Sequence, residues 1–130
     1  MKKAIFTAGI CFALMFASFM VSAQQPQVQD IPGPYMAIVS DSTSAEGVRF
    51  LEYIPSQKVC SRRIKLQVKD GVIASAQFVG GCSGNTQGVC SLIKGMPVSE
   101  AIEKLDGILC GRRGTSCPDQ LANALKLISK

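Results

Sequence analysis

Four cysteines have sequence surroundings that can support chemistry at sulfur: Cys60, Cys82, Cys110 and Cys117. The last two flank a short Gly/Arg loop that leads into an expected helix start, with Ser116 as its candidate cap. Thiols in such positions can ligate a soft metal ion, pair as disulfides or act as nucleophiles. The state of these sulfurs therefore decides what the chain does.

Metal binding is the first hypothesis. Glycines on both sides of Cys82 let the backbone approach a bound ion, and Cys117 lies at a helix N-terminus, which favours negative charge. Four thiolates would bind Zn²⁺ in a closed tetrahedral site, and an iron–sulfur cluster is compatible with the same ligands. The chain has no histidine, so the ligands must be thiolates, carboxylates or water. Cys90, within an expected helix, is interpreted as a small buried hydrophobe.

Thiol–disulfide chemistry is the alternative. Cys110 and Cys117 could form a redox-active pair with Cys117 as the nucleophile, and the two arginines between them would favour a thiolate or simply be solvated. Disulfides such as Cys82–Cys90 and Cys110–Cys117 could instead staple a small exported domain. No CxxC pair is present, and the spacing alone leaves both alternatives open.

The first 23 residues have the layout of a signal peptide. Lys2 and Lys3 precede an apolar, uncharged run from Ala4 to Met20, and Val21-Ser22-Ala23 fits a signal-peptidase site. We therefore expect cleavage after Ala23 and export to a periplasmic or extracellular location, where cysteines usually pair. An uncleaved membrane anchor is the alternative, because the apolar run approaches the ~18 residues that a spanning helix needs.

Composition narrows the remaining possibilities. Removal of residues 1–23 leaves 107 residues with a net charge of +3, because Lys2 and Lys3 leave and no acid does. That length suits one small domain. Without tryptophan or a long basic stripe, a nucleic-acid interface is not expected. Hydrolytic chemistry has no histidine base, and no Gly-Lys-Ser/Thr follows the glycines around Cys82 to form a phosphate loop.

The pattern along the chain predicts an α+β domain. Residues 24–45 are rich in Gln, Pro, Ser and Gly and are interpreted as a flexible linker, with a weak edge strand at 35–39, before a domain at 46–130. Strands are expected first, with a hairpin turn at Asp70-Gly71, and helices second. This order predicts a small antiparallel sheet with three helices packed on one face. The expected strands are 48–54, 63–69 and 72–79, and the expected helices begin at Asn85 or Thr86, at Ser99 and at Pro118.

Several short motifs occur along the chain in an order that points to a known family. They are Phe78-Val79-Gly80-Gly81-Cys82, Lys94-Gly95-Met96, Gly107-Ile108 with Cys110-Gly111, and Thr115-Ser116-Cys117-Pro118-Asp119 followed by Gln120-Leu121. On these motifs the chain resembles the TSCPD-domain family from about Tyr53 to the C-terminus. The stretch from Gly81 to Leu105 is also similar in architecture to iron–sulfur scaffold proteins.

The resemblance implies a metal-binding or thiol-relay role for the matching cysteines, Cys60, Cys82, Cys110 and Cys117, and leaves Cys90 as an extra residue. Domains of this family occur as short stand-alone proteins and at the C-terminus of cobalamin-dependent ribonucleotide reductases. The chain is too short for the reductase barrel, so the resemblance implies no reductase activity here. We expect an exported module, with zinc as the expected metal, a structural or accessory role and a protein partner that the sequence does not identify.

Overall fold

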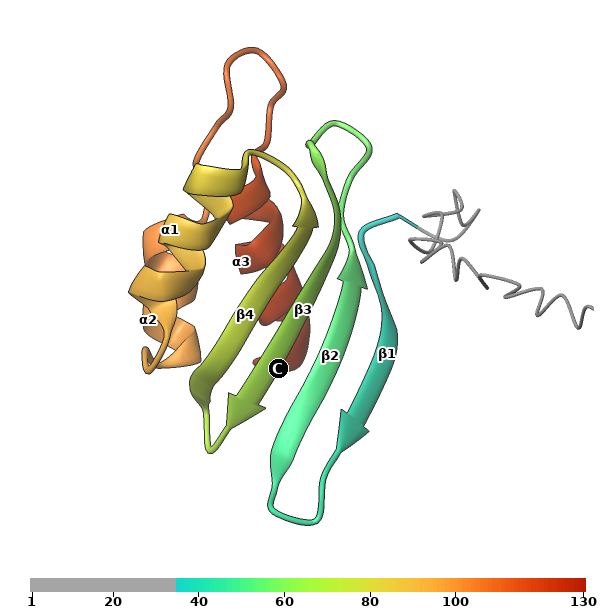
Figure 1. Cartoon of the computed structure of the whole chain (residues 1–130), viewed down its shortest axis with the longest axis vertical. Coiled ribbons are helices and arrows are strands. Elements are labelled where there is room, and N and C mark those ends of the chain that lie inside the picture. Colours follow the sequence, from blue (N-terminus) through green and yellow to red (C-terminus); the bar gives the residue numbers. More distant parts are fainter. Residues whose placement is uncertain (1–34) are drawn as a thin grey trace, which may run out of the picture. The chain divides into compact units, whose positions relative to one another are not determined.

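A four-stranded antiparallel sheet carries three helices on one of its faces (Figure 1). The computed structural model describes residues 35–130. The predicted signal peptide and the first part of the predicted linker lie outside the described residues. Within residues 35–130, no helix has the length and apolar character needed to cross a membrane.

The strands follow one another across the sheet in chain order, each antiparallel to the one before. Along β3, Ile64, Leu66 and Val68 are buried while Lys65 and Lys69 are exposed, which confirms the predicted alternation. The strands are β1 (Ala37–Thr43), β2 (Val48–Ile54), β3 (Ser61–Lys69) and β4 (Val72–Gly80).

The turn between β3 and β4 confirms the predicted Asp-Gly hairpin. Asp70 and Gly71 both have positive φ, 51° and 74°, and Lys69 pairs directly with Val72. Two central residues with positive φ match the type I′ turn, whose twist suits a tight hairpin. The turn therefore fixes the register of the β3–β4 pair.

The edge strand β1 lies within the residues that were predicted to form the linker, 24–45. The sequence suggested a short strand at 35–39, whereas β1 spans Ala37–Thr43 and pairs with β2 along its length. Most of β1 is exposed and polar, so it has little apolar alternation to reveal it. Backbone pairing and the ion pair between Asp41 and Arg49 hold it instead. The sheet consequently begins before residue 46.

All three predicted helices are present: α1 (Ser83–Ile93), α2 (Val98–Leu105) and α3 (Cys117–Ile128). Each begins slightly earlier than expected. The largest difference is in α1, where Cys82 is the cap in extended conformation and Thr86 N donates to the Cys82 carbonyl at 2.9 Å. The cysteine at the strand end therefore belongs to the helix terminus as well.

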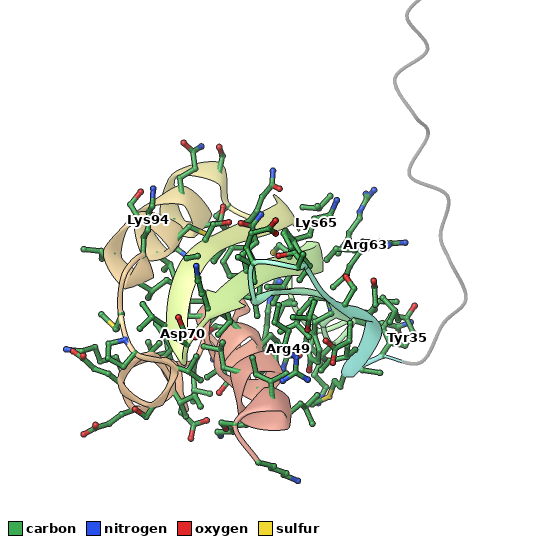
Figure 2. The ribbon with its side chains drawn as sticks, turned by 90° about the horizontal axis from the view of Figure 1, so that it is seen from below. Tyr35, Arg49, Arg63, Lys65, Asp70 and Lys94 are labelled. Atoms are coloured by element: carbon green, nitrogen blue, oxygen red, sulfur yellow. The ribbon has the colours of Figure 1, made fainter. Side chains whose placement is uncertain are left out.

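The core lies between the sheet and the helices. Arg63 and Lys65 project from the opposite face, away from α3 (Figure 2), as expected for an antiparallel sheet with one solvated side. The core residues are buried and apolar; from the strands they include Leu51, Tyr53, Ile64, Leu66 and Ile73, and from the helices Ile93, Ala101, Leu105, Leu121 and Leu125. The predicted α+β class is confirmed.

Candidate functional site

Three connecting segments meet at one end of the domain. Because β2 and β4 are both antiparallel to β3, the last residues of β2 and β4 and the first residues of β3 lie at the same end of the sheet. The loop between β2 and β3, the junction of β4 with α1 and the long loop between α2 and α3 all lie at this end (Figure 1). These segments carry the cysteines that the sequence analysis singled out.

A pocket of about 220 Å³ forms between these segments. All four predicted site cysteines line it, although they are spread over residues 60 to 117. Its walls are partly apolar and include one cation. The lining residues are Val59, Cys60, Cys82, Asn85, Ile108, Leu109, Cys110, Arg113, Ser116, Cys117 and Pro118.

The four cysteines differ in exposure. Cys60, Cys82 and Cys110 are exposed and Cys117 is buried at the base, so the pocket is accessible from solvent. All cysteines of the described part of the chain are free thiols in this structure. Within that part, no three Cys, Asp or Glu side chains are already placed to hold a metal ion together. The four cysteines therefore line one pocket, but within residues 35–130 they form neither a disulfide nor a ready-made metal site.

Two of these cysteines lie at helix N-termini. Cys82 caps α1, and Cys117 is the first residue of α3, directly after the cap Ser116. The Ser116 hydroxyl accepts a hydrogen bond from Asp119 N at 3.2 Å, which confirms the predicted cap. The N-terminus of a helix carries a partial positive charge. The pocket is therefore an electrostatic environment that suits anionic groups.

Arg113 adds a full positive charge. Its Nη1 donates to Cys60 Sγ at 2.9 Å and to the Lys58 carbonyl at 3.4 Å. The hydrogen bond to Cys60, together with the electrostatic influence of the nearby Cys60, Cys110 and Cys82 sulfurs, raises the pKa of Arg113. From the sequence, Arg113 could either favour a thiolate or simply be solvated. In the structure, its side chain lies beside the cysteine sulfurs and contacts that of Cys60.

The loop that bears Cys110 is closed at its base by Asp119. Its Oδ1 accepts from Gly107 N at 2.8 Å, and its Oδ2 accepts from the Thr115 hydroxyl at 2.6 Å. Thr115 in turn accepts from Gln120 Nε2 at 2.9 Å. Both ends of the loop are thus tied to the first turn of α3. In the sequence, Asp119 stood out only as the last residue of the Thr115–Asp119 motif.

Gln120 extends this network to the other cysteine loop. It is buried, and its Oε1 accepts from Ser56 N at 2.8 Å and from the Tyr53 hydroxyl at 3.4 Å. Burial, reinforced by the Asp119 carboxylate, raises the pKa of Tyr53 to about 12. No role for Gln120 was apparent from the sequence alone. A polar residue on a helix face turned toward the core was the available signal.

Gly81 allows α1, α3 and β3 to approach closely. Its φ is +89°, and a Cβ at this position would lie 3.0 Å from Thr86 Cγ2 and 3.7 Å from both Cys117 Sγ and Ser61 Cβ. Ser61 is buried, and its hydroxyl has no hydrogen-bond partner among the described residues. The chain around Gly81 is therefore closely packed, and a side chain at this position would crowd Thr86.

Cys90 lies apart from the four-cysteine pocket. It is half-buried on α1 in a separate hollow against Phe78 of β4. Burial raises the pKa of the Cys90 thiol, and a hydrogen bond with the Phe78 backbone partly opposes this. A neutral, partly buried thiol agrees with its interpretation as a small hydrophobe. It also makes Cys90 a matched control for experiments on the other four.

Comparison with protein families matches residues 43–129 to the family model described as the TSCPD domain. This match covers all three connecting segments of the pocket, all three helices and three of the four strands in full. Searches of curated proteins and of solved structures found no match.

Proposed function

Because the chain belongs to the TSCPD-domain family, we propose that its four-cysteine pocket is a zinc site with a structural or accessory role. The observation that carries this proposal is the convergence of Cys60, Cys82, Cys110 and Cys117 on one pocket from three separate connections. In a small domain, cross-linking such connections contributes folding stability that a limited core lacks.

The donor set fits a thiophilic ion. Four thiolates without histidine match the closed tetrahedral sites that Zn²⁺ occupies in structural roles. Such a site has a formal charge of −2, which the N-termini of α1 and α3 and the Arg113 guanidinium are placed to offset. When bound, zinc supplies a cross-link between the three connections.

Loading requires a local adjustment, since no three ligands are already placed to share an ion within residues 35–130. Three of the four cysteines are exposed and can change rotamer without disturbing the core. The buried Cys117 lies at the start of α3 and is the fixed point. We therefore expect the exposed sulfurs to move toward Cys117.

The test measures metal content and thiol state on one sample. The chain is expressed with its leader and without a polyhistidine tag, since it has no histidine of its own. We expect one zinc per chain by elemental analysis, with four thiols becoming reactive to alkylation only after denaturation. Serine replacements of Cys60, Cys82, Cys110 and Cys117 should each weaken zinc binding tenfold or more, on the order expected for a lost ligand or its support.

The control is Cys90→Ser, which should keep one zinc per chain. A wild-type chain that binds no zinc contradicts the proposal, as does equal loss in Cys90→Ser. A metal-free chain whose mass is lower by the hydrogens of one or two disulfides would instead support the Cys110/Cys117 redox or stapled alternative.

Export is part of the proposal. Its support is the signal-peptide layout of residues 1–23. Protein recovered from the periplasm or medium should begin at Gln24 when its N-terminus is sequenced. Full-length protein recovered only from membranes would favour the uncleaved anchor, and full-length protein in the cytoplasm would contradict export.

A further inference from the structure

The four cysteines do not receive positive charge in the same way. Cys82 and Cys117 lie at the N-termini of α1 and α3. Cys60 lies directly before β3, and a strand supplies no comparable dipole. At Cys60 the positive charge comes from a side chain of another loop, through the 2.9 Å contact of Arg113 Nη1 with Cys60 Sγ.

Arg113 also links two of the cysteine-bearing segments. Its backbone N–H donates to the Cys110 carbonyl at 3.3 Å, which closes a tight turn beside Cys110. Its guanidinium reaches across to Cys60 and to the Lys58 carbonyl, 53 and 55 positions earlier in the chain. One residue thus connects the turn of Cys110 to the loop of Cys60.

We propose that Arg113 is a positioning residue of the cysteine site, which holds Cys60 beside Cys110 and offsets the negative charge of the Cys60 sulfur when the site is loaded. This inference rests on the proposed zinc site. Arg113 itself is not a ligand. Its positive charge should favour a metal complex in which the Cys60 sulfur carries negative charge.

The physical reason is a difference between two states of one sulfur. An N–H donor bonds a thiolate ligand more strongly than a neutral thiol, because the bond is then charge-assisted. The contact therefore stabilises the loaded site more than the empty one. Outer partners of metal ligands typically contribute 10–100-fold to metal affinity. Lysine would keep the charge, but as a compact, strongly hydrated ammonium in place of the guanidinium whose Nη1 makes both contacts.

The neighbouring arginine provides a matched control. Arg112 lies in the same exposed loop, and its side chain makes no hydrogen bond or ion pair with another residue of 35–130. Replacing either arginine with methionine removes one positive charge from the loop and keeps a side chain of moderate length. Only Arg113→Met removes the donor to Cys60. Because Arg113 is exposed, the variant should fold normally.

The experiment titrates the untagged chain and its variants with Co²⁺ and follows the sulfur-to-metal charge-transfer absorption. We expect Arg113→Met to weaken Co²⁺ binding about tenfold. Its band should also move to longer wavelength, since a sulfur without the donor releases electron density more easily. Arg113→Lys should recover part of both effects, and Arg112→Met should bind within about twofold of wild type with an unmoved band.

The outcomes separate the two proposals. If wild type binds Co²⁺ and the two methionine variants behave alike, the role of Arg113 is overturned while the metal site stands. If Arg113→Met lowers affinity without moving the band, its effect does not pass through the Cys60 sulfur, and the proposal also fails. If wild type binds neither Co²⁺ nor Zn²⁺, both the zinc site and this inference are overturned.

Discussion

The side-chain oxygen of Gln120 accepts a hydrogen bond from the backbone N–H of Ser56 at 2.8 Å, across 64 positions of the sequence. Gln120 lies in the first turn of α3, three residues after Cys117, and Ser56 lies in the loop that leads to Cys60. This contact places the loop of one cysteine against the helix that begins with another. The geometry of the pocket thus depends on a residue that is not a candidate ligand.

Replacing Gln120 with alanine should destabilise the domain by roughly 2–4 kcal/mol, because the Ser56 N–H and the Thr115 hydroxyl oxygen lose their partner in a largely buried network. The measurement is chemical denaturation of the metal-free chain. Gln87, exposed on α1 with a local contact to Ser83, is the control. Its alanine variant should stay within about 0.5 kcal/mol of wild type, and an equal loss in both would contradict the coupling.

Gly81 offers a second test of how closely the site is built. Gly81→Ala should cost roughly 1–3 kcal/mol, because a side chain at φ +89° is strained and its Cβ would meet Thr86 Cγ2 at 3.0 Å. Thermal unfolding checks this. Gly88→Ala, within α1 and with nothing inside 4 Å of the added Cβ, should instead stabilise by up to about 1 kcal/mol. A neutral Gly81→Ala variant would contradict the packing described here.

Much of this fold could be predicted from the sequence because its signals are local. The alternation along β3 and the Asp70-Gly71 turn are short-range patterns, and they determined the sheet correctly. The strand β1 could not be predicted in the same way. Its mostly exposed, polar residues show no apolar alternation in the sequence. The strand is held by backbone pairing and by the ion pair between Asp41 and Arg49.

The candidate site shows the same division. The sequence singled out four cysteines, three of them beside glycines or at a helix start, and all four line one pocket. What spacing cannot convey is which loops meet. The contact of Arg113 with Cys60 and the bonds of Gln120 with Ser56 join residues more than 50 positions apart. Only the three-dimensional arrangement reveals them.

Ser61, which packs near Gly81, provides a test of the cost of an unpartnered buried hydroxyl. Ser61→Ala should stabilise the metal-free chain by roughly 1 kcal/mol, because a buried hydroxyl without a partner carries a desolvation cost that alanine lacks. Denaturant titration measures the change. Ser42→Ala, exposed on β1, should change stability by less than about 0.5 kcal/mol. Destabilisation of Ser61→Ala would show that this hydroxyl has a partner after all.

Tyr53 predicts a loss of stability at high pH. Its folded-state pKa of about 12 lies above the ordinary value of 10.0, because burial and the nearby Asp119 carboxylate disfavour the phenolate. Below pH 10 the phenol is protonated in both states and the stabilisation is complete. Between pH 10 and pH 12 the unfolded chain ionises first, so the free energy of unfolding falls by up to roughly 2 kcal/mol.

Tyr53→Phe isolates this contribution, since phenylalanine retains the ring and cannot ionise. The comparison is the free energy of unfolding of both proteins across pH 8 to pH 12, with exposed Tyr35 present in each. The stability of Tyr53→Phe should fall less steeply above pH 10, because its remaining losses come from other groups. Parallel curves would mean that the phenol ionises as easily in the folded chain as in the unfolded one. That result would contradict the burial of Tyr53 against α3, and with it the link from Tyr53 through Gln120 to the cysteine loops.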